Sequence, residues 1–192
     1  MLVDTTKAAD HISAGLTVRP ETDAAIQTGG VFHIQCFDKD GNLKWEDSSH
    51  NLVVNEGLQS MNTQYFKGSA YTAAFYLGLV TGPSGSVVFA AGNTLASHSG
   101  WTEFTAYSGA RKSLSFGTAS TANPSVISSS APAQFVITGS GGVVSGAFLC
   151  TVSSGTSGVL FSEALFSSPG DRTVALNDTL NVSYSFSNTA SA

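Results

Sequence analysis

Histidine is the first residue type to test for chemistry, because its side chain titrates near neutral pH and is a common metal ligand. The chain has four, each in a different segment: His11, His33, His50 and His98. No two of them have the i, i+4 spacing of a helical metal site or the short spacing of a metal-binding loop. His33 alternates with Gln35 on the outward face of a predicted strand, so we expect it in solvent. His98, in a Ser-Gly loop beside Trp101, is the one remaining candidate for a functional histidine.

Carboxylates and glycine-rich segments do not form a catalytic motif either. Glu46 and Asp47 are adjacent on a predicted strand, so they point to opposite faces and cannot share one acid/base site. Residues 139–146 are rich in glycine but contain no lysine, and no Gly-x-Ser-x-Gly motif is present. We therefore predict no catalytic residue, no bound metal and no cofactor, and we do not expect the chain to be an enzyme.

Charge is scarce in this sequence. The net charge is −5 and the pI is near 5.1, which argues against nucleic acid as a partner. Only 11% of the residues are charged, against about 25% in typical globular domains. Six charged residues follow Tyr107: Arg111, Lys112, Glu163, Asp171, Arg172 and Asp178. Ser, Thr and Gly are easily desolvated, so we expect another protein to cover much of the surface. The alternative is a plain β-protein with short polar side chains.

No membrane segment or secretion signal is expected. The longest apolar runs fall far short of the roughly 18 residues of a spanning helix. The first residues lack the basic start and apolar block of a signal peptide. The sequence therefore predicts a protein made in the cytoplasm, with no membrane partner.

Two hydrophobic patterns indicate the fold class. Residues 146–152 are apolar at both alternating sets of positions, which is typical of a strand covered on both faces. Residues 179–187 alternate between apolar and polar, as expected for a strand with one wet face. Further strands are predicted at 73–80, 112–117, 124–130, 133–138, 158–166 and 171–176. The chain is predicted to be all-β, an antiparallel β-sandwich of jelly-roll or immunoglobulin-like topology.

The segment 31–66 is predicted to form a hairpin followed by a single short helix. Residues 31–37 and 43–45 are the strands, and 38–42 carry an Asp-Gly turn. Asn55 is the expected helix cap, with an apolar face that packs over an open end of the sandwich. That face consists of Val54, Leu58, Met61 and Tyr65.

Cys36 and Cys150 fall at apolar positions of two strands. They are expected to be buried free thiols, although a disulfide between them remains open.

Residues 1–30 have no helical or strand period and are predicted to be an extended N-terminal arm, with the sandwich domain spanning 31–192. Apolar residues occur along the arm at intervals and are its candidate interaction anchors: Leu2, Val3, Ile12, Leu16 and Val18. Such an arm is either disordered or ordered by a neighbour.

Six pieces of the sequence resemble a family of small bacteriophage virion proteins encoded among the head genes. They are Asn51-Leu-Val-Val-Asn-Glu-Gly-Leu58, Phe75-Tyr-Leu-Gly-Leu-Val80, Ala91-Gly-Asn-Thr-Leu-Ala-Ser-His-Ser-Gly-Trp-Thr-Glu-Phe104, Gly146-Ala-Phe-Leu149, Leu160-Phe-Ser-Glu163 and Asp178-Thr-Leu-Asn-Val182. The match covers about residues 31 to 187 and leaves out the arm.

The resemblance implies a phage structural protein, and in its sharper form a capsid cement (decoration) protein. Such a protein binds the outer surface of the major capsid protein shell as a homodimer or homotrimer and stabilises the head. The alternative is a tail or tail-fibre component, for instance a receptor-binding one, for which Trp101 with Glu103 is the candidate carbohydrate site. A third alternative is an adhesion module outside any virion. The family supplies no catalytic or ligand residues.

Overall fold

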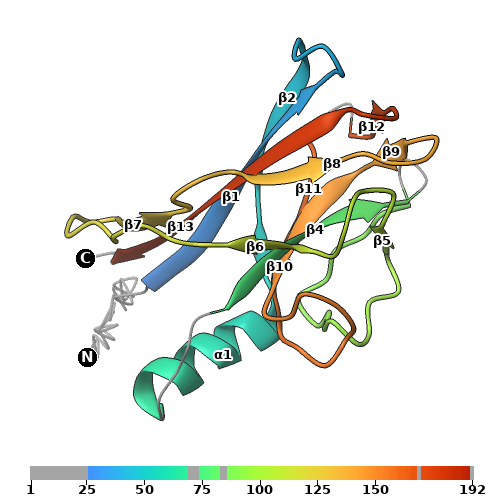
Figure 1. The fold of residues 1–192 in the computed structure, drawn as a ribbon. Coiled ribbons are helices and arrows are strands. Elements are labelled where there is room, and N and C mark those ends of the chain that lie inside the picture. The colour runs from blue at the N-terminus through green and yellow to red at the C-terminus, as the bar shows by residue number, and fades with distance from the viewer. Residues whose placement is uncertain (1–25, 69–73, 83–85, 168–169, 191–192) are drawn as a thin grey trace, which may run out of the picture.

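A computed structural model describes residues 26–68, 74–82, 86–167 and 170–190 as a β-sandwich with one helix (Figure 1). Every strand pair among these residues is antiparallel. The helix accounts for 8% of the described residues, so the predicted all-β class with one short helix is confirmed.

The first sheet is built on two long strands that pair along their whole length. β1 (Ile26–Phe37) and β13 (Thr179–Ala190) pair from Ile26 opposite Ala190 to Phe37 opposite Thr179. β2 (Leu43–His50) pairs with the other edge of β1, and β7 (Ser125–Ser128) and β8 (Ala133–Val136) pair with β13. β1 therefore begins five residues before the expected start of the sandwich. Residues 26–30, which the sequence analysis placed in the arm, belong to the sheet.

The second sheet is centred on the strand with two apolar faces. Its order is β3 (Leu52–Val53), β11 (Leu160–Leu165), β10 (Gly146–Cys150), β4 (Phe75–Thr81) and β5 (Thr102–Phe104). β6 (Lys112–Leu114) also pairs with β4, and β9 (Gly142–Val144) forms a separate two-stranded sheet with β12 (Arg172–Val174). All five residues of β10 are buried, as the sequence predicted.

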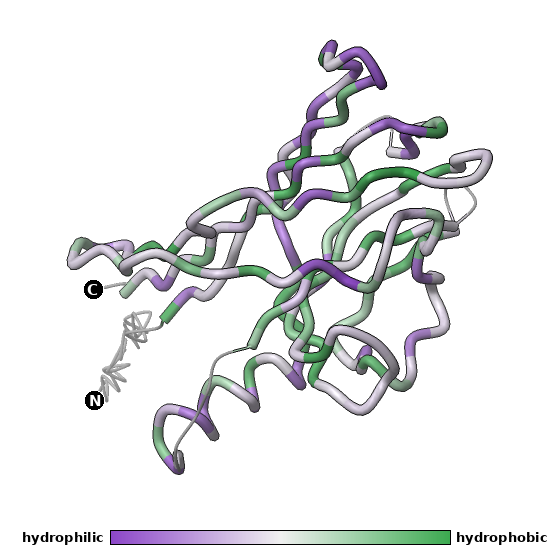
Figure 2. Tube along the Cα trace, viewed as in Figure 1, coloured by the Kyte–Doolittle hydropathy of each residue, from purple (hydrophilic) through white to green (hydrophobic). Residues whose placement is uncertain are grey.

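β10 is buried on both faces because each face contacts a different core. Ala147 and Leu149 face the first sheet and pack in the main core with Phe32, Ile34 and Val182. Phe148 and Cys150 face the other way, into a second core that Leu95 and Trp101 of the segment 86–104 complete. Figure 2 shows the hydrophobic residues gathered in these central strands and the hydrophilic ones at the tip of the β1–β2 hairpin. The excursion between β4 and β5 is therefore a cover for the outer face of the second sheet.

The helix α1 (Asn55–Phe66) forms in the predicted segment, but its cap lies one residue earlier than expected. Val54 is the N-cap, and no side chain caps the helix, so the cap predicted at Asn55 is wrong. Instead Glu56 accepts a hydrogen bond from the Leu160 backbone N–H of β11, at 2.9 Å. Gly57 lets the helix approach this strand, because a Cβ there would come within 2.2 Å of the Phe161 carbonyl oxygen. These contacts fix the first turn of α1 against the second sheet.

Candidate functional site: a charge-poor surface and an apolar groove

The histidines of the described part of the chain do not converge. The Nδ1 atom of His33 lies 2.9 Å from the Ser48 hydroxyl on the surface, and the His98 ring stacks on Trp101 with centroids 3.7 Å apart. His50 is exposed at the end of β2, and His11 lies outside the described residues. Within the described ranges, no three His, Cys, Asp or Glu side chains gather as a metal site.

Glu163 is fully buried in β11, where it anchors the cover segment 86–104. Its carboxylate accepts hydrogen bonds from Trp101 Nε1 at 2.9 Å and Asn93 Nδ2 at 2.8 Å. The Ala90 backbone N–H donates a third bond at 3.1 Å. Burial raises the pKa of this carboxyl, and the three donors act against that rise. Every partner of Glu163 is thus a structural donor of the cover segment.

Trp101 and Glu103, the pair expected to form a carbohydrate site in a tail protein, do not form an exposed binding site. Trp101 is only 6% exposed, because its ring packs against Phe148 and its N–H binds Glu163. Glu103 forms a bidentate ion pair with Arg111, at 2.9 and 2.8 Å. Sugar-binding sites in proteins need an exposed aromatic face, and the ring of Trp101 is covered.

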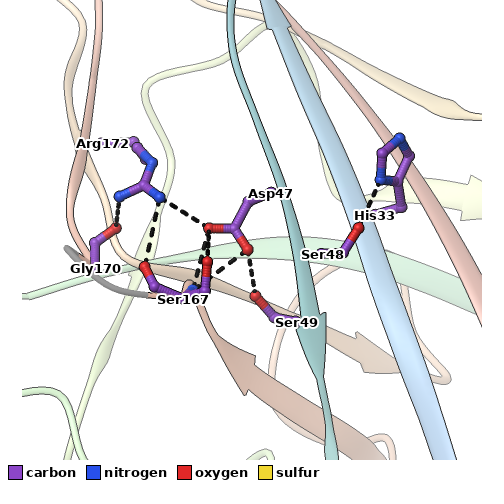
Figure 3. Close-up of polar contacts among 7 residues, drawn as sticks. All are labelled: His33, Asp47, Ser48, Ser49, Ser167, Gly170 and Arg172. Atoms are coloured by element: carbon purple, nitrogen blue, oxygen red, sulfur yellow. Dashed lines mark hydrogen bonds and ion pairs between the residues drawn. The ribbon is translucent and has the colours of Figure 1, made fainter.

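Asp47 is the centre of a second buried polar cluster (Figure 3). Its side chain, 0% exposed, accepts hydrogen bonds from Arg172 Nη2 at 3.0 Å, Ser49 Oγ at 2.9 Å and Ser167 Oγ at 2.9 Å. The Ser167 backbone N–H adds another at 3.1 Å, and Arg172 also donates to the Gly170 carbonyl at 2.8 Å. Figure 3 shows these groups converging on the carboxylate from β2 on one side and from the β11–β12 connection and the start of β12 on the other. Asp47 and Glu46 face opposite sides of β2, as predicted.

Asp178, directly before the start of β13, contacts Cys36 in a third internal polar cluster. Asp178, 3% exposed, pairs with Lys44 and accepts a hydrogen bond from the Ala175 backbone N–H at 2.7 Å. Burial, with Asp178 nearby, raises the pKa of Cys36 to about 12, so this thiol stays protonated and unreactive. Cys36 and Cys150 are both buried free thiols, as expected.

Several of the scarce charged residues take part in these internal contacts. None of the six charged residues after Tyr107 is exposed. Arg111, Glu163 and Asp178 are buried, and Lys112, Asp171 and Arg172 are half-buried. The solvent-exposed side chains of residues 108–167 and 170–190 are therefore uncharged. Sequence composition indicated a low charge, but only the structure shows that three of these six residues are buried and the other three half-buried.

The second feature is an apolar groove between α1 and the paired ends of β1 and β13. It has a volume of about 760 Å³, and its walls include Leu58, Tyr65 and Phe66 of the helix and Ile26, Thr28 and Asn188 of the strands. Tyr65 and Phe66 are 83% and 80% exposed. The predicted packing of the helix face over the sandwich is correct for Val54 and Met61 but wrong for Leu58 and Tyr65, which are exposed and line this groove.

The groove was not predicted because its walls are far apart in the sequence. Ile26 was assigned to the arm, and Phe66 lies one position outside the predicted apolar face. Two adjacent aromatic residues at a helix end were the only local signal. The five arm anchors, Leu2, Val3, Ile12, Leu16 and Val18, lie outside the described residues.

Comparison with protein-family models found no match, and searches of curated proteins and of solved structures found none either. The resemblance to phage virion proteins therefore stands on the sequence pieces quoted above. None of the described helices is long and apolar enough to cross a membrane.

Proposed function

We propose that this chain is a non-enzymatic bacteriophage capsid cement (decoration) protein. It binds the outer surface of the major capsid protein shell and stabilises the head. The observation that carries the proposal is that all six charged residues after Tyr107 are buried or half-buried, which leaves mainly short polar side chains on the exposed surface of residues 108–167 and 170–190. Such a surface loses little solvation energy when another protein covers it, whereas charged side chains are costly to bury unless they are paired.

The arrangement of the acidic groups supports a structural role over a catalytic one. A general acid or base needs a carboxyl group within reach of a substrate. Glu163 and Asp47 are instead enclosed and bound by donors of the fold itself. These two carboxylates tie loops to the sheets, which suits a protein whose task is to stay rigid.

The burial of Trp101 favours the head over the tail. A receptor-binding tail protein was expected to use Trp101 with Glu103 to bind a sugar, and that ring is buried. A cement protein needs no such site, because it binds the shell through many weak contacts that add together across copies. Its partners are the major capsid protein and further copies of itself, as a homodimer or homotrimer. It is made in the host cytoplasm and located on the capsid exterior.

The test is the copy number of this chain in purified particles of the phage that encodes it. Quantitative mass spectrometry should find hundreds of copies per particle, in a fixed ratio to the coat protein. Emptied heads without tails should keep the same ratio. Tens of copies or fewer, or loss of the chain from tailless heads, would show a tail component. Absence from particles would rule out any virion role.

A further inference from the structure

The groove beside α1 exposes large apolar side chains that a free subunit would normally bury. Ile26 is 74% exposed, and the rings of Tyr65 and Phe66 contact each other edge to face, with centroids 4.9 Å apart, instead of packing on the core. Large contiguous apolar patches on soluble proteins generally mark a binding surface. A smaller apolar cavity of about 230 Å³ continues from Met61 and Gln64 under the helix. The groove therefore needs an occupant.

The chemistry of the walls restricts what can bind there. None of the described residues that line the groove is charged, and its polar walls are amides and hydroxyls, such as those of Asn188 and Thr28. Thr28 Oγ1 already donates to Asn188 Oδ1, at 3.1 Å. The occupant must therefore be apolar and uncharged over the length of the groove, since a buried charge would have no partner.

The chain itself contains a segment of this chemistry next to the groove. Twenty-five residues precede Ile26, and Ile26 is part of the groove wall. Within them, residues 11–18 (His-Ile-Ser-Ala-Gly-Leu-Thr-Val) form an uncharged stretch between Asp10 and Arg19. Its apolar residues are Ile12, Leu16 and Val18.

The connection between this stretch and the groove has the right length. Residues 19–25 separate it from Ile26, and a chain of that length spans at most about 29 Å when extended. Pro20, followed by Glu-Thr-Asp, supplies a residue that favours a reversal of the chain. A short tether gives the segment an effective concentration in the millimolar range at the groove. A free ligand or a second copy would have to compete with that concentration.

We propose that, in the unassembled subunit, residues 11–18 bind in the groove of their own chain, with Ile12, Leu16 and Val18 against Leu58, Tyr65 and Phe66. The segment then acts as an intramolecular strap that covers the apolar surface. The inference does not depend on the capsid function, because it concerns the isolated chain alone.

Photo-crosslinking identifies the occupant directly. A photo-reactive phenylalanine analogue at position 65 of the full-length chain should crosslink to residues 11–18 of the same chain, as mapped by mass spectrometry. The same analogue at position 176, an exposed leucine of the β12–β13 connection, is the control and should give no such product. In a mixture of ¹⁵N-labelled and unlabelled chains, crosslinks between the two isotopes would overturn the proposal and make a second copy the occupant. Crosslinks that never include residues 11–18 would also overturn it.

A dye experiment on full-length variants tests the covering role. Ile12→Asp with Leu16→Asp should release the strap and raise the fluorescence of bound bis-ANS several-fold. Thr5→Asp with Thr6→Asp adds the same charge outside the stretch and should leave the fluorescence unchanged. Adding Phe66→Ser to the released variant should lower it again, whereas adding Leu176→Ser should not. Equal fluorescence in the strap variant and the unmodified chain would overturn the proposal. Circular dichroism confirms that each variant is folded.

Discussion

The ring of Phe148 occupies the space that a side chain on Gly78 would need. The two residues are directly opposite each other on β10 and β4, and a Cβ on Gly78 would lie 2.2 Å from Phe148 Cζ. The absence of a side chain at Gly78 thus creates the room for Phe148 between the second sheet and the cover segment. Trp101, whose ring centroid is 5.1 Å from that of Phe148, closes the same space from outside.

The first prediction is that Gly78 and Phe148 are energetically coupled. Phe148→Ala should lower the free energy of unfolding by about 3–5 kcal/mol, because a fully buried ring is lost. Gly78→Ala should cost about 1–3 kcal/mol by overpacking. In the double variant the added methyl group meets no ring, so the combined loss should be smaller than the sum of the two. Urea denaturation of the four proteins measures the coupling, and strictly additive losses would contradict the contact.

The second prediction concerns the Asp47 cluster. Asp47→Ala should lower the free energy of unfolding by about 3–5 kcal/mol, because Arg172 loses its carboxylate partner in a largely buried position. Asp40→Ala is the matched control, since Asp40 pairs with Lys39 on the surface, where both side chains are more than half exposed. The control should change stability by at most about 1 kcal/mol. Equal effects of the two substitutions in urea denaturation would show that the cluster does not hold β2 to the β11–β12 connection.

The third prediction is a pH dependence that arises from Glu163. Burial raises the pKa of this carboxyl in the folded state above its ordinary value of about 4.5, so the folded protein binds a proton more readily than the unfolded chain. The stabilisation is fully present below about pH 4.5 and is lost as the pH rises through the folded-state pKa.

Glu163→Gln isolates this effect. The substitution removes the titratable carboxyl group, and the NH₂ of the glutamine side chain then faces the hydrogen-bond donors of the cover segment. This should lower the free energy of unfolding by about 1–3 kcal/mol near neutral pH. The stability of the natural protein relative to this variant should then increase as the pH falls from 7 towards 4.5. Denaturation curves of both proteins over that range measure the difference. A difference that stays constant or shrinks on acidification would contradict the raised pKa.

The sequence was sufficient to predict the strands because their patterns are set by local alternation. The two apolar faces of residues 146–152 correctly indicated a strand covered on both sides, and the alternation in 179–187 correctly indicated a half-buried one. The helix was predicted in the segment where it occurs because its apolar residues recur at helical spacing. Local patterns, however, do not say what covers each face.

The contacts that shape the candidate surface are long-range, and this is why they were missed. Glu163 binds Trp101 across 62 positions, and Asp47 binds Arg172 across 125. Glu56 bonds to Leu160 of β11, so α1 starts without the expected Asn55 cap. β1 begins at Ile26 because Ala190 pairs with it from the other end of the chain. None of these pairings has a signal in the surrounding sequence.

The fourth prediction is that the protein is a homo-oligomer with an interface poor in charge. The outer surface of residues 108–167 and 170–190 carries no exposed charged residue, so contacts made there should be insensitive to ionic screening. Light scattering after size-exclusion chromatography should therefore give the same dimer or trimer mass at low and high salt. A monomer under both conditions, or an oligomer that dissociates at high salt, would contradict this interface.

The last prediction is that the N-terminal segment contributes to retention on the capsid. Ordering 25 residues costs on the order of 25 kcal/mol or more in backbone entropy, which apolar anchors and backbone hydrogen bonds to a partner must offset. Because β1 starts at Ile26, the deletion that tests this must end at residue 25 to leave the sheet intact. The shortened chain should still bind capsids but dissociate at a lower temperature than the full chain.

Heating decorated particles and measuring the bound fraction by sedimentation compares the two chains. A full-length chain with Thr5→Asp and Thr6→Asp keeps every apolar anchor and should be retained like the natural protein. Replacing Leu2, Val3, Ile12, Leu16 and Val18 with Ser should reproduce the effect of the deletion, because these side chains are the proposed anchors. If the shortened chain stays bound to the same temperature as the full chain, attachment resides wholly in the sandwich, and its charge-poor surface must supply all of the binding energy.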